Sequence, residues 1–263
     1  MRATLIRRTA LAASAVSLTL LATACGGGSS DGGDDKGAKD KGGSSAPAAD
    51  KALTAADLEK VIVAQGDVKG HKVEKVSPEL EQQGKATVTR NECQAITDVM
   101  SLKPVGEPAG TAKRQVTGEP KKPSVSASTA PEDMEDAMAQ ALNVNSTVVT
   151  LASYEGKGAE EALAALKTAG TACAAGFGAT ADGEDVKVTK ITETPVSGGD
   201  EAAGWTVVVN MEGKDIPFYQ LAAVRKGSTL ATFGGMNLAA MAGKDVKPEP
   251  PTAVIEAQVA KLG

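Results

Sequence analysis

The three cysteines of this 263-residue chain constrain its fold more than any other feature, because they stand in two different sequence environments. Cys25 directly follows an uncharged run at 9–24, which three arginines near the start of the chain precede. A basic segment, a short apolar run and small residues at the cut are typical of a secretory signal peptide. Cys93 and Cys173 lie far downstream, in segments with helical periodicity. One cysteine therefore belongs to a cleavage site and two belong to the folded chain.

A cysteine directly after the cut indicates a bacterial lipoprotein signal, in which residues 1–24 are removed and the Cys25 thiol carries the lipid. Ala22 departs from this pattern, because leucine is usual three residues before the cysteine. An ordinary secreted protein is the alternative, and Arg7-Arg8 leaves twin-arginine export open beside the general route. The apolar run is shorter than the roughly 20 residues that span a bilayer. We therefore expect acyl chains, such as palmitate, to hold the protein at the outer, extracytoplasmic face of the cell membrane.

The chain after Cys25 divides by composition into a tether and one domain. Residues 25–53 consist largely of Gly, Ser, Ala, Asp and Lys. Such a segment buries too little apolar surface to offset the entropy of ordering it, so we expect a disordered tether. A capping pattern that begins at Thr54 opens the region 54–263, which we expect to form a single α+β domain.

Charge and composition exclude several classes of partner. The formal net charge is −5, and no basic block occurs after the signal segment, which argues against nucleic acid. The chain has one Trp, two Tyr and three Phe, too few for the aromatic platforms that stack bases. It has one histidine, so we expect neither a metal site nor a cofactor.

Cys93 and Cys173 are expected to form a structural disulfide. Outside the cytoplasm, two remaining cysteines in one domain usually pair. Cys93 shares a helical face with Ile96, and Cys173 continues an apolar stripe with Leu166, so both sulfur atoms should point inward. A bridge that closes a loop of about 80 residues contributes about 4.5 kcal/mol if its whole effect is entropic. A redox role is the alternative, but the chain contains no C-x-x-C motif.

Hydrophobic periodicity predicts an α+β fold. We expect helices near 54–62, 92–102, 157–175 and 252–262, and strands near 71–76, 112–116, 145–154, 186–191, 205–211, 218–225 and 229–233. The last four strands follow one another closely, with hairpin turns such as 226–228 between them. The fold class is therefore an antiparallel sheet of about five or six strands with helices packed mainly on one face. The Pro- and Gly-rich segment 103–131 is expected to be a long surface excursion.

The strand at 218–225 leaves the nature of the second sheet face open. Trp205, with Val207 and Val209, should face the helices, whereas the opposite side of the sheet is partly polar. That side is either exposed to water or floors a cleft that the segment 103–131 covers. If a ligand cleft exists, its candidate residues are Tyr154, Trp205, Tyr219 and Arg225.

Other motifs favour structural roles. His71 has no second histidine or carboxylate cluster beside it, so a surface position is expected. The glycines of 176–178 follow a helix, whereas a dinucleotide-binding loop follows a strand, so a helix end and turn are expected. The acidic run 132–136 follows a proline and is interpreted as the start of a helix.

The order of elements resembles a known family. The pattern comprises two Cys-bearing helices, a strand that ends in Leu-Ala-Ser-Tyr at 151–154, a Trp-led strand, the run 221–228 and a C-terminal helix. Together they resemble actinobacterial lipoproteins related to the extracellular sensor domain of PknH-type serine/threonine kinases, over roughly 54–263. The resemblance implies an antiparallel sheet with a cleft and a ligand-binding or sensing role. That family has two disulfides and this chain can form one, so the chemistry of the family's cleft is not carried over.

We expect a non-enzymatic module of the cell envelope that binds a small molecule or an envelope protein, with no catalytic residue. A lipid carrier or lipoprotein chaperone with an apolar cavity is one alternative. An envelope enzyme without a recognisable motif is the second.

Replacing Cys25 with Ala is expected to release the protein from membranes, because the acyl chains attach to that thiol. Cell fractionation followed by immunoblotting measures the change, and Ser29→Ala serves as the matched control. Membrane retention of Cys25→Ala equal to that of the control would contradict the anchor.

Overall fold

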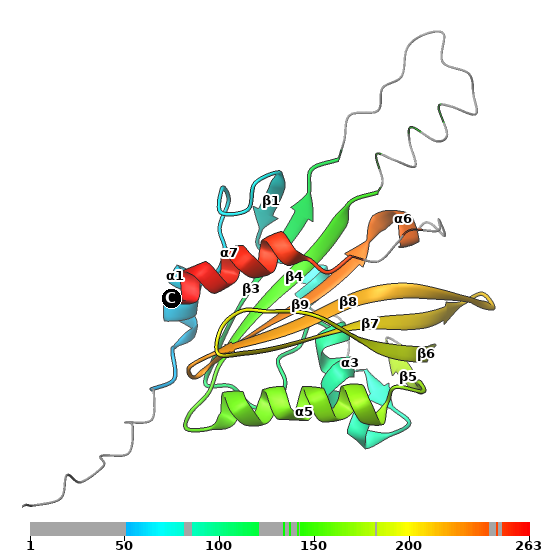
Figure 1. The fold of residues 1–263 in the computed structure, drawn as a ribbon, viewed down its shortest axis with the longest axis horizontal. Coiled ribbons are helices and arrows are strands. Elements are labelled where there is room, and N and C mark those ends of the chain that lie inside the picture. The colour runs from blue at the N-terminus through cyan, green and yellow to red at the C-terminus, as the bar shows by residue number, and fades with distance from the viewer. Residues whose placement is uncertain are drawn as a thin grey trace, which may run out of the picture. The chain divides into compact units, whose positions relative to one another are not determined.

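Figure 1 shows the fold as a computed structural model, which describes residues 51–81, 86–120, 143–181, 183–241 and 249–263 and the single positions 134, 137, 141 and 246. The signal segment, Cys25, nearly all of the expected tether and the carboxylates of the acidic run 132–136 lie outside the described residues. The described residues belong to one compact unit, Ala46–Gly263. None of their helices is both long enough and apolar enough to span a bilayer.

The described residues form one antiparallel sheet of nine strands in the order β1-β3-β4-β9-β8-β7-β6-β5-β2. The four-strand meander β6 to β9 that the sequence predicts is confirmed, and it forms consecutive neighbours in the sheet. The strands are β1 (His71–Glu74), β2 (Thr87–Val88), β3 (Gly110–Gly118), β4 (Asn145–Ser153), β5 (Phe177–Ala181), β6 (Glu184–Thr194), β7 (Glu201–Met211), β8 (Lys214–Lys226) and β9 (Thr229–Asn237).

The prediction of five or six strands is wrong, and two of the additional strands lie at one edge of the sheet. β5 begins at Phe177, directly after Gly176 at φ +91°, where the sequence suggested only a turn. β2 has two residues, which pair with Thr180 and Ala179 of β5. β2 is too short for a period of two to be recognised in the sequence, and β5 has two glycines at or beside its start, which favoured the interpretation as a turn. The short strand expected near 112–116 is confirmed as β3, which is longer than predicted and lies between β1 and β4.

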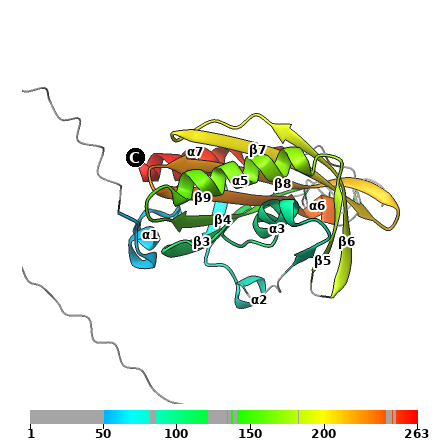
Figure 2. The ribbon, with the colours of Figure 1, turned by 90° about the horizontal axis from the view of Figure 1, so that it is seen from below.

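Helices cover both faces of this sheet, so the expectation of helices mainly on one face is wrong. Leu221 and Ala223 of β8 pack in a cluster with α3 and α5, whereas Ala222 and Val224 pack in a cluster with α1 and α7. Figure 2 shows α5 and α3 lying together across one side of the strands. The helices are α1 (Ala55–Val61), α2 (Pro78–Glu81), α3 (Gln94–Met100), α5 (Gly158–Ala172), α6 (Leu238–Met241) and α7 (Thr252–Leu262).

On the second face of β8, Ala222 and Val224 are buried beneath α7 and α1, and the described part of the segment 103–131, residues 103–120, contributes the strand β3 to the sheet itself. Val254 and Ile255 of α7 are 2 % and 3 % exposed and pack in the same cluster as Ala222 and Val224. The sequence alternation misleads here because a strand that is buried on both faces carries apolar side chains on both. The helix-facing positions are as predicted, since Trp205 packs with the α3 and α5 cluster.

The structure contains the predicted disulfide. Cys93 lies in the short 3₁₀ turn that precedes α3, and Cys173 follows the last residue of α5. Their Cα atoms are 5.9 Å apart although 80 residues separate them in sequence. Both residues are fully buried, so the bond joins the start of α3 to the end of α5 within the core that covers one face of the sheet.

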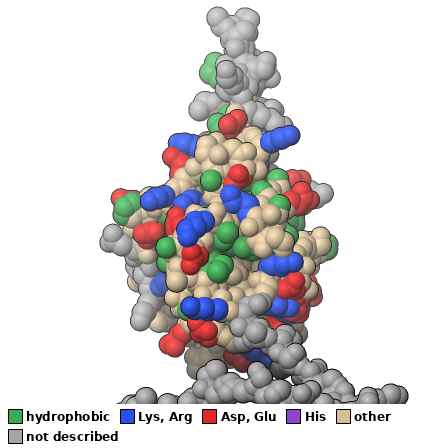
Figure 3. Space-filling view, turned by 90° about the vertical axis from the view of Figure 1, so that its left-hand side faces the viewer, with side chains coloured by type: hydrophobic (Ala, Val, Ile, Leu, Met, Phe, Trp, Pro, Cys, Tyr) green, Lys and Arg blue, Asp and Glu red, His purple; other side chains and the backbone are tan. Residues whose placement is uncertain are grey.

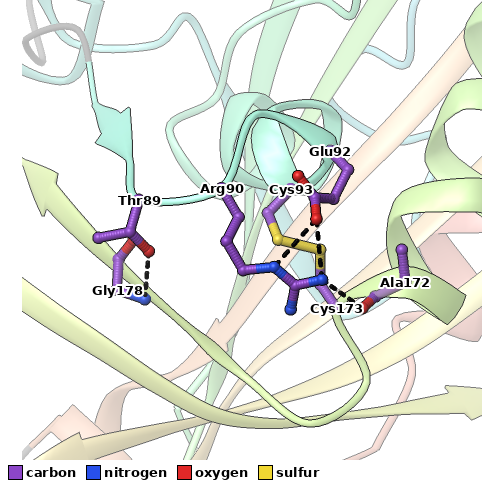
Figure 4. A network of polar contacts seen from close by, with 7 residues as sticks. All are labelled: Thr89, Arg90, Glu92, Cys93, Ala172, Cys173 and Gly178. Carbon is purple, nitrogen blue, oxygen red and sulfur yellow. Dashed lines mark hydrogen bonds and ion pairs between the residues drawn. A yellow bond between two sulfur atoms is a disulfide. The ribbon is translucent and has the colours of Figure 1, made fainter.

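Polar contacts beside the disulfide also join the segment that precedes Cys93 to α5 and β5 (Figure 4). Arg90 donates to the Glu92 carboxylate at 2.9 and 3.0 Å and to the carbonyl of Ala172 at 3.1 Å. The last carbonyls of a helix have no partner within the helix, so this donor satisfies one of them. The Thr89 amide donates to the Gly178 carbonyl at 2.9 Å, which attaches the same segment to β5.

A buried glutamine fastens α7 to α1 on the opposite face. Gln258 is fully buried, and its Oε1 accepts a hydrogen bond from the Val63 amide at 2.9 Å. Its Nε2 donates to the carbonyl of Val61, the last residue of α1, also at 2.9 Å. One side chain thus satisfies two backbone groups at a helix end.

Replacing Gln258 with Ala is expected to lower the free energy of unfolding by about 2–4 kcal/mol, because it leaves one buried amide and one buried carbonyl without partners. Denaturant titration followed by circular dichroism measures the change. Glu256→Ala, an exposed position on the same helix, is expected to stay within about 0.5 kcal/mol of the parent protein. Equal midpoints for the two variants would refute the role of the glutamine.

Candidate functional site

The structure does not gather the four candidate cleft residues into one cavity. Tyr219 and Arg225 both lie on β8, six positions apart, which places them about 20 Å from each other. Trp205 lies on β7 opposite Leu221, and Tyr154 directly follows β4. The four therefore have separate surroundings.

The side chains of Tyr154 and Tyr219 make structural contacts inside the fold. Tyr154 is 4 % exposed, and its hydroxyl donates to the carbonyl of Val105 at 2.7 Å. Burial raises the pKa of Tyr154 to about 12, so the hydroxyl stays protonated and keeps this bond. Tyr219 packs edge-on against Phe218 with ring centroids 4.8 Å apart, and burial raises its pKa as well.

Arg225 is committed to ion pairs at the end of β8. Its Nη1 lies 3.2 Å from Oδ2 of Asp200 and donates to the Gly227 carbonyl at 3.3 Å. Its Nε lies 3.9 Å from Oε2 of Glu201. The Gly227 amide also donates to Asp200, and this bond holds the pKa of that carboxyl below its usual value. Arg225 therefore fixes the β8–β9 turn and has little freedom to bind a ligand.

Of the four, Trp205 borders an open groove of ligand size, which we name the α5 groove. Its volume is about 430 Å³. One wall is a single face of α5 and the turn that follows it, because its residues are spaced by three or four positions. The other wall comes from β6 and β7. The lining residues are Lys167, Gly170, Thr171, Ala174, Ile191, Glu193, Ala202 and Trp205.

The contact between Gly170 and Trp205 shapes the floor of the α5 groove. A Cβ atom at position 170 would overlap the indole nitrogen and would lie 2.9 Å from Cδ1 of Trp205. Glycine in a helix interior is about 1 kcal/mol less favourable than alanine, so its presence in this Ala-rich helix requires a reason. The reason is that the indole ring lies directly against the helix backbone.

Charged side chains stand along one edge of the α5 groove. Lys167 Nζ lies 2.5 Å from Oε1 of Glu201, and the same carboxylate faces Arg225. The hydrogen bond from Lys167 is the main reason why the pKa of Glu201 lies below its usual value. Glu193, on β6, is exposed on the opposite wall. The groove thus offers a small-residue wall, charges of both signs at its rim and a floor in which the indole of Trp205 is 4 % exposed.

The chemistry of this arrangement is suited to binding. A general acid or base needs a pKa near the working pH, and Glu201 is shifted in the opposite direction. Within the described ranges, no three His, Cys, Asp or Glu side chains are grouped closely enough to hold a metal ion. His71 is half-buried on β1 at the far edge of the sheet, and its Nδ1 lies 2.9 Å from the carbonyl of Lys69.

Sequence reasoning identified Trp205 but missed its partners in the α5 groove. Lys167, Gly170 and Ala174 belong to the predicted helix, yet only the fold shows which of its faces borders β7. Gly170 is the one residue whose type gave a usable signal, since a glycine in a helix interior marks a close approach.

Comparison with solved structures finds a likeness in fold. No family model matches this chain, and no curated protein matches it in sequence. Its structure is similar to that of the extracellular domain of PknH from Mycobacterium tuberculosis, with a TM-score of 0.43 and 11% sequence identity, over 81% of this chain and 97% of that chain. At this level of likeness no ligand, activity or residue role is transferred.

Replacing Gly170 with Ala is expected to displace the indole of Trp205, because the added methyl group overlaps it. Overpacking of this kind costs about 1–3 kcal/mol, more than alanine gains in helix propensity. Trp205 is the one tryptophan of the chain, so its fluorescence reports the change directly, as a shift of emission to longer wavelength. Thr171→Ala, the exposed neighbour, is the control. Identical emission in the two variants would contradict the contact.

Proposed function

We propose that this chain is a non-enzymatic ligand-binding or sensor module, held at the outer face of the cell membrane by a lipid on Cys25. The observation that carries the binding function is the α5 groove. Small-molecule sites are concave, occupy about 300–1,000 Å³ and combine apolar surface with a few polar groups. The groove, at about 430 Å³, has the indole of Trp205 on its floor and Lys167 at its rim.

The disulfide supports an extracytoplasmic location. Disulfides persist in oxidising compartments and are rare in the cytosol of most organisms. The Cys93–Cys173 bond is itself buried between two helices, where it is part of the core. Together with the signal-like segment before Cys25, it favours a protein that folds after export.

Binding is favoured over the two alternatives by how the groove is built. A lipid carrier needs an enclosed apolar cavity, but Leu163 and Leu166 of α5 are fully buried and fill the space between this helix and the sheet. An enzyme needs a reactive group that is free to act. Lys167 and Glu201 are instead paired with each other at the groove's edge.

The charge distribution supports a small-molecule or protein partner over nucleic acid. Figure 3 views the side on which α1 and the end of α7 lie, and acidic and basic side chains intermingle there around a small apolar patch. Basic side chains on these helices are paired, as Lys60 is with Asp57 and Lys261 with Asp67, at 2.7 and 2.8 Å. Nucleic-acid binding requires an uncompensated basic surface.

The test is to fill the α5 groove without disturbing the core. Ala174 is exposed and lines the groove, so Ala174→Phe places a ring inside it. We expect native mass spectrometry of the full chain, extracted from its membranes in detergent, to detect a bound small molecule. Its occupancy should fall at least about tenfold in Ala174→Phe, equivalent to about 1.4 kcal/mol.

Ala175→Phe is the matched control, because Ala175 is also exposed but is not among the residues that line the groove. The control is expected to keep the bound molecule. Equal occupancy in the two variants would place the ligand elsewhere, and a parent protein that carries no bound molecule would refute the groove as a small-molecule site.

A further inference from the structure

The α5 groove lies beside an unpaired stretch of strand. β5 pairs with β6 only from Glu184 to Val188, so in the described part of the chain the rest of β6 has no strand beside it on that side. The bulge between Val188 and Lys190 lies where this pairing ends. Ile191 and Glu193, in the unpaired stretch, line the α5 groove. The groove therefore has a helix on one side and a strand with a free edge on the other.

One hydrogen bond shows which way this free edge points. The Ile191 amide donates to the carbonyl of Ala174 at 3.0 Å, so it points away from β7 and toward the end of α5. Ala174 itself lines the groove. Every second residue of a strand presents its amide and carbonyl to the same side, so Glu193 presents both groups in this direction too. An edge of this kind is a ready template for another extended chain.

The wall that α5 contributes leaves room for such a chain. Its residues opposite the free edge include Gly170, Thr171 and Ala174, which have small side chains. From Ile191 to Thr194 the free edge is about 10 Å long, which matches three or four residues of an extended peptide. A peptide that pairs with β6 here lies between the strand and the helix.

Glu193 is the charge of this groove that lacks a partner. Lys167 is paired with Glu201, and Glu201 also faces Arg225. Glu193 is exposed and forms no ion pair with any residue that the structure describes. Side chains that are directly opposite on paired strands lie close together, and opposite charges at such positions stabilise the pairing. The groove therefore favours a peptide with a basic side chain opposite Glu193.

We propose that the ligand of the α5 groove is an extended peptide segment with a basic side chain, a step that rests on the binding function proposed above. The peptide adds to β6 as a further strand, which is a common mode of peptide recognition. Its backbone bonds the amide and the carbonyl of Glu193, and its basic side chain meets the Glu193 carboxylate. The small residues on α5 are then required for the width of the groove.

NMR titration of the full, ¹⁵N-labelled chain in detergent tests this proposal. The probe is the peptide acetyl-Val-Lys-Val-Lys-Val-amide, and its control is the same peptide with a methyl group on every backbone nitrogen. We expect the probe to slow hydrogen exchange of the Glu193 amide at least about tenfold, because the amide gains a partner. The amide of Thr192, which points to β7, is expected to stay unchanged. Equal effects of the two peptides on Glu193, or no effect of either, would overturn the proposal.

Two variants locate the peptide in the groove. Ala174→Phe is expected to weaken binding of the probe at least about tenfold, whereas Ala175→Phe keeps it. Glu193→Gln keeps the shape of the side chain and removes its charge. The parent protein should prefer the probe to acetyl-Val-Gln-Val-Gln-Val-amide, and Glu193→Gln should bind the two peptides equally. Binding that is unchanged in Ala174→Phe, or a parent protein without this preference, would overturn the assignment.

Two outcomes separate the peptide from the groove itself. If no peptide protects Glu193, but a small molecule accompanies the parent protein and is lost from Ala174→Phe, the peptide is wrong and the groove remains a binding site. If no ligand of either kind depends on position 174, both the peptide and the proposed function of the groove are wrong.

Discussion

The pairing of β4 with β9 is the constraint on which the rest of this fold depends. Nine residue pairs, from Asn145 opposite Asn237 to Ser153 opposite Thr229, join strands that are far apart in sequence. β1 and β3 lie on one side of this pair, and the meander β8 to β5 lies on the other. Both core clusters cross it, because Val149 and Phe233 face α1 and α7 while Ala152 and Leu230 face α3 and α5. Without this ladder neither helix layer has a complete surface to cover.

A disulfide on one face of the sheet and a pair of side-chain hydrogen bonds on the other connect the helices within each layer. On one face the Cys93–Cys173 bond joins the start of α3 to the end of α5, and Arg90 adds a hydrogen bond to the same helix end. On the other face Gln258 joins α7 to α1 through two hydrogen bonds. The covalent bond acts largely on the unfolded chain, by restricting it. The glutamine acts on the folded chain, by giving partners to buried backbone groups.

The sequence predicts the strongly patterned parts of this molecule and fails where tertiary contacts decide. The strands β4 and β6 to β9 and the helices α1, α3, α5 and α7 follow from periodicity and turn residues, and the disulfide follows from cysteine arithmetic. The sequence does not predict that α1 and α7 cover the second face of the sheet. Ala222 and Val224 are small apolar residues that fit equally well on a half-exposed strand. The candidate site divides in the same way. Trp205 stands out by its residue type, whereas its contact with Gly170 depends on how α5 crosses the sheet.

The link between Gln258 and Val63 spans 195 residues, and this distance has a consequence for how the chain is made. As the chain is synthesised, α1 emerges long before α7, so Leu58 and Ile62, which are buried in the finished domain, have no α7 to cover them. A chain that is cut or stalled before Gln258 keeps these side chains accessible. An unfinished molecule thus differs from a finished one at its first helix, where apolar side chains are accessible.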